Sequence, residues 1–546
     1  MAVESGGSGT AGTQSRAASA GWWLARVTLE LLAVTALFAA AGAWPTPDSN
    51  EAHYLPRARH AWDPTWAAGD FFLESKEAHG VFYRLLGPLA GKLPLEDAAW
   101  IGRWCGWGAL AAGYGWAASA VLPSMAGRVV AAALFSVAVR HTPAAGEWVI
   151  GGCEAKVFAW ALVLAGVGWF ARGRIGPAWM SLGAATAIHP LVGGWAMIVL
   201  VPVAVREIWL HGSGKRERSG ALILELAGGL ALAALGVLPA LALSGDADAA
   251  LRAKATATYV TERLPHHLLL RTFADGFAAR QILAILLWWM LLPLGGRSPA
   301  RRRMAAFTAG AIGVSLAGCL VSLLERPAPE FAHGLLRFYW FRLADGIVPL
   351  GLSVAAVAAM DDGLAKGGRR WIAWAVVAGL VGVDLVVESQ HWPLPGRTGL
   401  VARADSKVQA AAWRDICGWV RDNTPADACF LTPRAATSFH WYTARREVVC
   451  WKNVPQDPKS IIQWRQRIID CYSSDGTLKG LAPSTADLGM ERVREVASRY
   501  GADHIIVAVN PLLPSPFPDP PLHANSGYAV HRLPDPRAPS PAALAP

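Results

Sequence analysis

The chain has 546 residues, of which 53% are hydrophobic and 16% are charged, and its formal net charge is +10. Ordinary soluble proteins carry about 25% charged residues, so this composition, with a mean hydropathy of +0.30, excludes a typical soluble domain and predicts a membrane protein. The positive charge would also suit a nucleic-acid-binding protein, but the basic residues cluster in loops between apolar runs. Membrane topology explains them there without nucleic acid.

The N-terminal segment 1–21 is rich in Gly, Ser and Ala, and we expect it to be disordered. The first apolar run, residues 22–44, lacks a small-residue cleavage site, which favours a retained membrane helix over a signal peptide. A shorter stretch, residues 80–93, carries Arg and Lys and is typical of an interfacial segment. The eleven predicted spans are about 22–44, 98–121, 126–142, 154–171, 175–188, 190–207, 220–243, 280–295, 304–324, 345–360 and 371–388.

The distribution of basic residues orients these spans. Residues 175–207 could form one long helix broken at His189–Pro190, but a single span would place the basic loop after it outside. We therefore expect two short spans that turn at residues 189–194, with the N-terminus in the cytoplasm. The dense Lys/Arg clusters then fall on the cytoplasmic side, at Arg128, 172–174, 206–219, 295–304 and 361–370.

The character of the chain changes after residue 388. Helical and strand-like segments alternate, which predicts a small α/β domain over residues 389–533, followed by a Pro/Ala-rich tail at 534–546. The preceding eleven spans place this domain outside the cytoplasm. The predicted helices are 407–423, 460–472 and 491–501, and the predicted strands are 428–432, 447–451, 503–509 and 528–533.

The seven cysteines include four in the C-terminal region: Cys417, Cys429, Cys450 and Cys471. No CxxC pair occurs, which argues against a zinc ribbon. Four cysteines allow three disulfide pairings, and free buried thiols are an equal alternative.

The predicted topology gathers most of the remaining ionisable groups on the outer side. Charged groups beside hydrocarbon are costly and often functional, although outer loops are also wet and polar for ordinary reasons. The five outer segments are the large first loop 45–97, residues 140–156, His189, residues 259–271 and residues 325–345.

Two acids of the first outer loop are the candidate catalytic residues. Glu51 follows the first span closely, and a carboxylate there could take a proton from an acceptor hydroxyl; the alternative is a solvated acid or a helix N-terminal acid. Asp70 could position a substrate or a metal.

Other outer residues are candidates for substrate binding. Glu154 and Lys156 are two apart, so on a helix they would face different directions and need separate partners. Arg342 and Asp345 are three apart and would share a helix face, and Arg337 and Tyr339 precede them in an aromatic stretch. Interfacial arginines among aromatic rings suit a phosphate or a stacked sugar, or else an aromatic belt with a structural ion pair.

The segment 262–268 adds Arg263, His266 and His267. With His53 and His189, these histidines make a divalent metal conceivable, although adjacent histidines cannot both face one ion from a helix. His189 has the simpler alternative of a hydrogen bond at the turn forced by the following proline.

The motif "NEAHYL" (50–55) places an acidic residue, Glu51, soon after the first span. Together with the many spans and the outer C-terminal domain, it resembles the GT-C superfamily of membrane glycosyltransferases over roughly residues 22–450. "GGCEAK" (151–156), "HPLVGGW" (189–195) and "FYWFRLAD" (338–345) are similar to an uncharacterised bacterial branch related to that superfamily. Asn50 departs from the family, which has an acid at this position, so Glu51 would have to replace it.

The resemblance implies a multi-pass protein of the bacterial inner membrane that takes a sugar from a polyprenyl-phosphate carrier. Its acceptor would be a glycan, a lipid or a protein. Glu51, with Asp70, would act as the catalytic carboxylates, and no cofactor is certain apart from the conceivable metal. The carrier phosphate would be held by Lys156, Arg263, Arg337, Arg342 and Tyr339, with Glu154, His189, His266, His267 and Asp345 in supporting positions.

Two other classes of function remain open. A transporter or lipid flippase would place its charges near the bilayer midplane on broken helices, whereas most charges here lie at one rim. A non-catalytic scaffold that displays the C-terminal domain would lose function on deletion of 389–546 but not on replacement of the outer acids.

Overall fold

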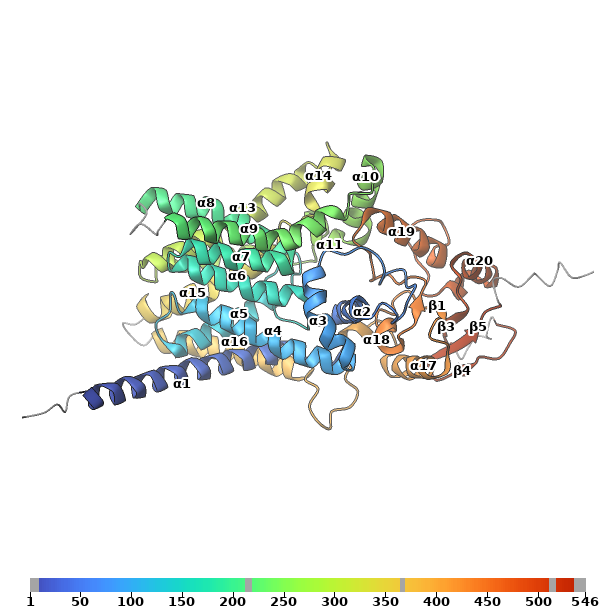
Figure 1. The fold of residues 1–546 in the computed structure, drawn as a ribbon, viewed down its shortest axis with the longest axis horizontal. Coiled ribbons are helices and arrows are strands. Elements are labelled where there is room, and N and C mark those ends of the chain that lie inside the picture. Colours follow the sequence, from blue (N-terminus) through green and yellow to red (C-terminus); the bar gives the residue numbers. More distant parts are fainter. Residues whose placement is uncertain (1–8, 212–218, 364–368, 510–516, 535–546) are drawn as a thin grey trace, which may run out of the picture.

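The molecule is elongated, with a bundle of long helices at one end and a smaller α/β domain at the other (Figure 1). The computed structural model describes residues 9–211, 219–363, 369–509 and 517–534. Several short helices lie at the end of the bundle that faces the domain. These are α2 (Glu51–Trp62), α3 (Gly80–Lys92), α10 (Ala249–Ala257), α11 (Pro265–Leu268) and α14 (Pro329–Leu336).

A helix lies at each of the eleven predicted spans. Six helices of the described residues are long and apolar enough to cross a membrane, namely α1, α8, α9, α13, α15 and α16. The chain is thus an integral membrane protein, and the count of eleven spans stays a prediction. The eleven helices are α1 (Gly9–Gly42), α4 (Leu95–Ala118), α5 (Met125–His141), α6 (Ala155–Ala171), α7 (Ile175–Ile188), α8 (Pro190–His211), α9 (Ser219–Ala242), α12 (Phe277–Leu291), α13 (Pro299–Leu323), α15 (Arg342–Ala358) and α16 (Arg369–Ser389).

Helix α1 begins earlier than the sequence pattern predicts. It starts at Gly9, so the expected disordered segment 1–21 is wrong for residues 9–21. Alanines recur through this part of the chain and favour helix, which explains the extension. Residues 1–8 of that segment, and residues 535–546 of the predicted tail, lie outside the described residues.

The bundle exposes large apolar side chains on its outside and packs small residues inside. Leu224 is 74% exposed, Trp289 66% and Val383 68%, as expected for side chains that face lipid. Inside, a Cβ at Gly113 would lie only 2.1 Å from the Ala161 carbonyl oxygen, so glycine there allows the backbones of α4 and α6 to touch.

The chain turns between α7 and α8 as predicted. Helix α7 ends at Ile188, His189 has an extended backbone, and α8 begins at Pro190. Proline suits the first position of a helix because its missing N–H would have no partner there. The turn places His189 against His79 of the first outer loop.

The C-terminal domain has the predicted α/β character. Its sheet has the order β2-β1-β3-β5-β4, with β1 parallel to β2 and β3, and β5 antiparallel to β3 and β4. Of the predicted strand 447–451, Glu447 alone lies in a strand, β2, and the Trp451 N–H bonds to the Arg434 carbonyl outside the sheet. The elements are α17 (Ala410–Asn423), β1 (Cys429–Leu431), α18 (Phe439–Thr443), β2 (Arg446–Glu447), α19 (Pro458–Tyr472), α20 (Met490–Tyr500), β3 (His504–Ala508), β4 (His523–Ala524) and β5 (Tyr528–Arg532).

Candidate functional site

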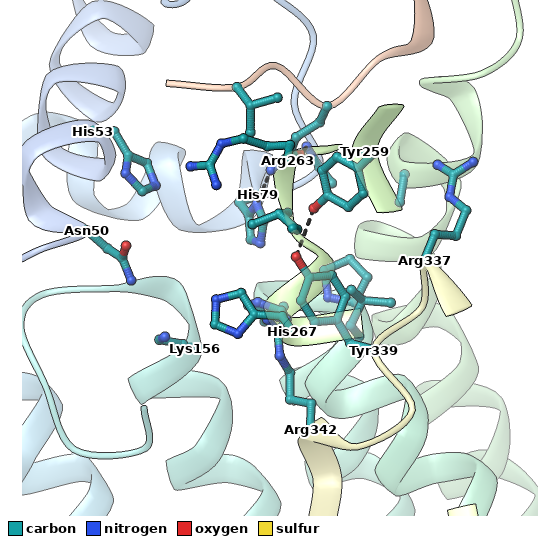
Figure 2. A pocket seen from close by; sticks show the side chains of 18 of the residues that line it. Asn50, His53, His79, Lys156, Tyr259, Arg263, His267, Arg337, Tyr339 and Arg342 are labelled. Atoms are coloured by element: carbon teal, nitrogen blue, oxygen red, sulfur yellow. Dashed lines mark hydrogen bonds between the residues drawn. The ribbon is translucent and has the colours of Figure 1, made fainter. Parts of the chain in front are cut away.

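A cavity of about 480 Å³ lies between the bundle and the C-terminal domain (Figure 2). All five of the predicted outer segments contribute to its lining, and the C-terminal domain supplies a sixth group of residues. The topology read from the sequence thus brought together segments that are far apart in the chain. Its charged lining residues are Arg57, Glu147, Glu154, Lys156, Arg263, Arg337, Arg342 and Lys452.

Glu51 is not among the residues that line the cavity. Its carboxylate is fully buried and forms a two-pronged ion pair with Arg103, with Nε–Oε1 and Nη2–Oε2 distances of 2.7 and 2.6 Å. The backbone N–H groups of Asp48 and Cys153 also donate to it, at 2.7 and 2.6 Å. With both oxygens occupied and no exposure, Glu51 is placed to hold the first outer loop on the bundle, not to receive a proton from an acceptor.

Asp70 also lies outside the cavity lining and is fully buried. It accepts a hydrogen bond of 2.7 Å from His440 Nε2 and one of 3.0 Å from the Glu447 N–H. Burial lowers the pKa of His440, but Asp70 and Glu447 outweigh it and raise that pKa to about 9. The protonated imidazole and Asp70 therefore fasten the first outer loop to the C-terminal domain.

Glu154 lines the cavity. Its position corrects the expectation that Glu154 and Lys156 face different directions. Glu154 has an extended backbone before the first turn of α6, so helical directions do not apply to it. Its Oε2 lies 3.3 Å from Lys156 Nζ and accepts a 2.9 Å hydrogen bond from Asn50 Nδ2. The expectation that Glu154 and Lys156 need separate partners is therefore wrong. Burial, the largest influence, raises the pKa of Glu154 despite its neighbour Lys156.

A second cavity carboxylate, Glu147, was missed in the sequence. Its Oε2 lies 2.7 Å from Arg342 Nε, and its Oε1 is buried without a hydrogen-bond partner among the described residues. The guanidinium of Arg342 also lies over the Tyr339 ring, 3.9 Å from the ring centroid. Glu147 stands alone between Gly146 and Trp148 in the sequence, and no other charged residue lies at a helical or strand spacing that would have indicated its role.

Asp345 does not pair with Arg342 as their helical spacing allowed. Its carboxylate accepts three backbone N–H groups at 2.7, 3.1 and 3.2 Å, from residues 144, 145 and 147. Asp345 thereby fixes the loop that carries Glu147, and Arg342 turns to Glu147 instead.

Arg337 and Arg263 are half-buried cations whose hydrogen-bond partners among the described residues are neutral. Arg337 donates to Thr256 Oγ1 at 3.2 Å, and Arg263 donates to the carbonyl groups of Trp451 and Lys452 at 3.0 and 3.3 Å. Between them the hydroxyl groups of Tyr259 and Tyr339 lie 3.0 Å apart (Figure 2). Tyr339 has a positive φ of 55°, a strained conformation that is often found at functional sites.

The histidines of the cavity are in settings that keep them neutral. Burial lowers the pKa of both His79 and His267 to about 3, and His267 Nδ1 lies 2.5 Å from the Ala145 carbonyl oxygen. The rings of His266 and His267 are tilted by 47° with centroids 4.2 Å apart, and His189 lies against His79 with ring centroids 4.8 Å apart. Among the described residues, no group of three His, Cys, Asp or Glu side chains could hold a metal ion. All seven cysteines are free thiols.

Lys452 is the other residue that sequence reasoning missed. It comes from the C-terminal domain, and its Nζ donates to the Ser49 carbonyl of the first outer loop. Burial lowers its pKa to about 8, a shift that Arg263 and Lys156 increase and that Glu154 and Asp48 oppose. A lone lysine in a mixed domain gives no signal in the sequence that it reaches back to the membrane part.

Comparison with known proteins gives a short family match and distant similarity to solved structures. Residues 411–471 match a family described as a domain of unknown function, DUF6798. No curated protein matches the chain. Among solved structures, the chain is similar to ArnT from Cupriavidus metallidurans, crystallised bound to undecaprenyl phosphate, with 14% identity, a TM-score of 0.31 and coverage of 94% of this chain and 98% of that one.

Proposed function

We propose that the protein is a membrane glycosyltransferase that takes a sugar from a polyprenyl-phosphate carrier and passes it to an acceptor outside the cytoplasm. The observation that carries this proposal is a cavity at the rim of the bundle that is lined both by apolar side chains and by cations and carboxylates. Such a cavity suits an amphiphilic donor, and its position suits a substrate that arrives through the bilayer.

Apolar residues that line the cavity lie beside the exposed apolar surface of the bundle. Ala240 and Leu243, in and just after α9, line the cavity, while Leu238 and Leu241 of the same helix are 63% and 65% exposed on the exterior. A polyprenyl tail lying along α9 would thus keep its hydrocarbon in the bilayer while its head enters the cavity.

Arg337 is the best-placed cation for the carrier phosphate. Lys156 and Arg342 are each neutralised by a carboxylate, at 3.3 and 2.7 Å. In the described part of the chain, Arg337 instead contacts a threonine hydroxyl and the Phe338 ring. It sits on the same side of the cavity as the hydroxyls of Tyr259 and Tyr339, which can donate to phosphate oxygens (Figure 2).

We assign the base to Glu154 instead of Glu51. Glu154 lines the cavity beside Asn50, and a pKa raised by burial makes a carboxylate a better proton acceptor. In the proposed step, Glu154 takes the proton of the acceptor hydroxyl as its oxygen bonds to the anomeric carbon. The bond from that carbon to the phosphate oxygen breaks, and the carrier phosphate leaves with the electron pair.

The positions of basic residues also orient the protein in the membrane. Arg128 and Arg301 lie in the first turns of α5 and α13, and Arg172 follows the end of α6 whose other end bears Lys156 of the cavity lining. Basic residues at such helix ends mark the cytoplasmic side. The cavity and the C-terminal domain then face outward from a bacterial inner membrane.

Binding of the carrier tests this proposal. Native mass spectrometry in mild detergent should show undecaprenyl phosphate retained in preference to phosphatidylglycerol, and Arg337→Gln should weaken that retention about tenfold or more, since a charge-assisted hydrogen bond contributes about 1.5–3 kcal/mol. Arg326→Gln removes an exposed arginine at the same end of the bundle and outside the cavity, and should change nothing. Equal retention of the two lipids by the wild type would refute the proposal and favour a transporter or a scaffold.

A further inference from the structure

The charges that line the cavity exceed what one carrier phosphate requires. Six Lys and Arg side chains but only two carboxylates, Glu147 and Glu154, line it. Two of the six cations are paired with those carboxylates, namely Arg342 and Lys156. The other four are bonded to carbonyl or hydroxyl oxygens in the described part of the chain, and these are Arg57, Arg263, Arg337 and Lys452.

The four cations are not gathered at one point. Arg337 lies on one side of the cavity, and Asn50 and Lys156 lie on the other, with Arg263 between them (Figure 2). Lys452 belongs to the side of Asn50, because its Nζ bonds to the Ser49 carbonyl. Arg57 is 3% exposed and is held by the carbonyls of Phe72 and Ser75, which leaves it little freedom to meet a ligand.

Lys452 and Arg263 are also joined to each other. Arg263 Nη2 donates to the Lys452 carbonyl at 3.3 Å, so the two cations are held at one seam between the bundle and the C-terminal domain. In the described part of the chain, the hydrogen bonds of these two cations go to carbonyl groups, and the carboxylates of Glu154 and Asp48 act on Lys452 only through space. A further anion between two partly buried cations would be favourable. Burial, the main cause, and the neighbouring Arg263 lower the pKa of Lys452 to about 8.

We infer that Lys452 and Arg263 form a subsite for a second anionic group, separate from the carrier phosphate at Arg337. This inference rests on the proposed function and extends it. The second anion is a phosphate or a carboxylate. It belongs either to the donor, as the second phosphate of a diphosphate-linked carrier, or to an anionic acceptor. The C-terminal domain then supplies a binding residue as well as covering the cavity.

Titrations with defined probes separate the two sources. Undecaprenyl phosphate and undecaprenyl diphosphate are titrated separately into the purified full-length protein, and inorganic phosphate is then titrated into protein saturated with undecaprenyl phosphate. Lys452→Gln removes the subsite charge. Lys459→Gln is the matched control, an exposed lysine of the same domain that lies outside the cavity.

If the anion is on the donor, the diphosphate carrier should bind at least about tenfold tighter than the monophosphate, and Lys452→Gln should remove the difference. If it is on the acceptor, the two carriers should bind alike, and inorganic phosphate should bind at least about tenfold more weakly to Lys452→Gln. The inference is overturned if the wild type neither prefers the diphosphate carrier nor binds inorganic phosphate. It is also overturned if Lys452→Gln binds all three probes as Lys459→Gln does. Failure of the wild type to prefer undecaprenyl phosphate over phosphatidylglycerol would instead count against the proposed function, and inorganic phosphate alone would then test the subsite.

The pH dependence gives a readout that a purely structural role would not produce. Lys452 is protonated below its pKa of about 8, so binding of the second anion should be strong below pH 8 and weaken as the pH rises through that value. Lys452→Arg keeps a charge at all these pH values and should flatten the profile. An unchanged decline in Lys452→Arg would show that another group is responsible.

Discussion

Replacement of Glu154 by Gln should lower the rate of sugar transfer by about 10²- to 10⁴-fold, the usual contribution of a general base. Gln keeps the size of the side chain and a polar contact to Asn50, but it cannot accept the acceptor proton. Binding of undecaprenyl phosphate should not weaken, because the phosphate is assigned to Arg337, across the cavity from Asn50 and Lys156, and a Lys156 freed from Glu154 attracts an anion more strongly. The rate is measured as label passing from a radioactive polyprenyl-phosphate sugar into membranes that contain the acceptor.

Glu147→Gln is the matched control, because Glu147 is the second carboxylate of the cavity. It should release Arg342 from its 2.7 Å ion pair and change the affinity for substrate more than the chemical rate. If Glu147→Gln lost the rate and Glu154→Gln kept it, the base would be Glu147 and the assignment made above would be wrong.

Replacement of Arg103 by Met should destabilise the protein by about 3–5 kcal/mol, because it leaves the carboxylate of Glu51 buried without its cation. Both side chains are 0% exposed, and Arg103 also donates to the Trp44 carbonyl and lies over the Trp100 ring. The loss is measured as a fall in thermal unfolding temperature in detergent. The double variant Glu51→Gln/Arg103→Met should recover part of it, since no buried charge then remains unpaired.

A partly exposed ion pair serves as the control for removing an arginine from any ion pair. Arg465 pairs with Glu262 at 2.7 Å, but their side chains are 27% and 30% exposed. Arg465→Met should therefore cost less than about 1 kcal/mol. A similar cost for both variants would mean that the Glu51–Arg103 pair is not the anchor of the first outer loop.

The sequence predicts the helices of this protein well because long apolar runs need no knowledge of partners. The turn at His189–Pro190 and the small α/β domain followed from local signals of the same kind. The predicted topology placed five segments on the same side of the membrane, and these segments line one cavity. That prediction needed only the number of spans and the positions of the basic loops.

The roles of individual residues followed less well, because they depend on partners that the sequence does not reveal. Glu51 is an outer-loop acid by position, yet Arg103, 52 residues later, makes it a buried anchor. A lone arginine in an apolar helix was a signal that it needed a partner. Glu154 met Lys156 because a residue that precedes a helix does not follow helical spacing. Lys452 reaches the cavity from a different domain, which no local pattern could show.

Photocrosslinking tests the central claim most directly, namely that a polyprenyl-phosphate carrier binds with its head in this cavity. A photoreactive polyprenyl phosphate is added to the wild type in lipid nanodiscs, and the labelled peptides are mapped by mass spectrometry. The proposal predicts labels in residues 240–259 and 337–342, removed by excess undecaprenyl phosphate but not by phosphatidylglycerol. Labels spread over the lipid-facing sides of α13 and α16, or removed equally by both lipids, would contradict it.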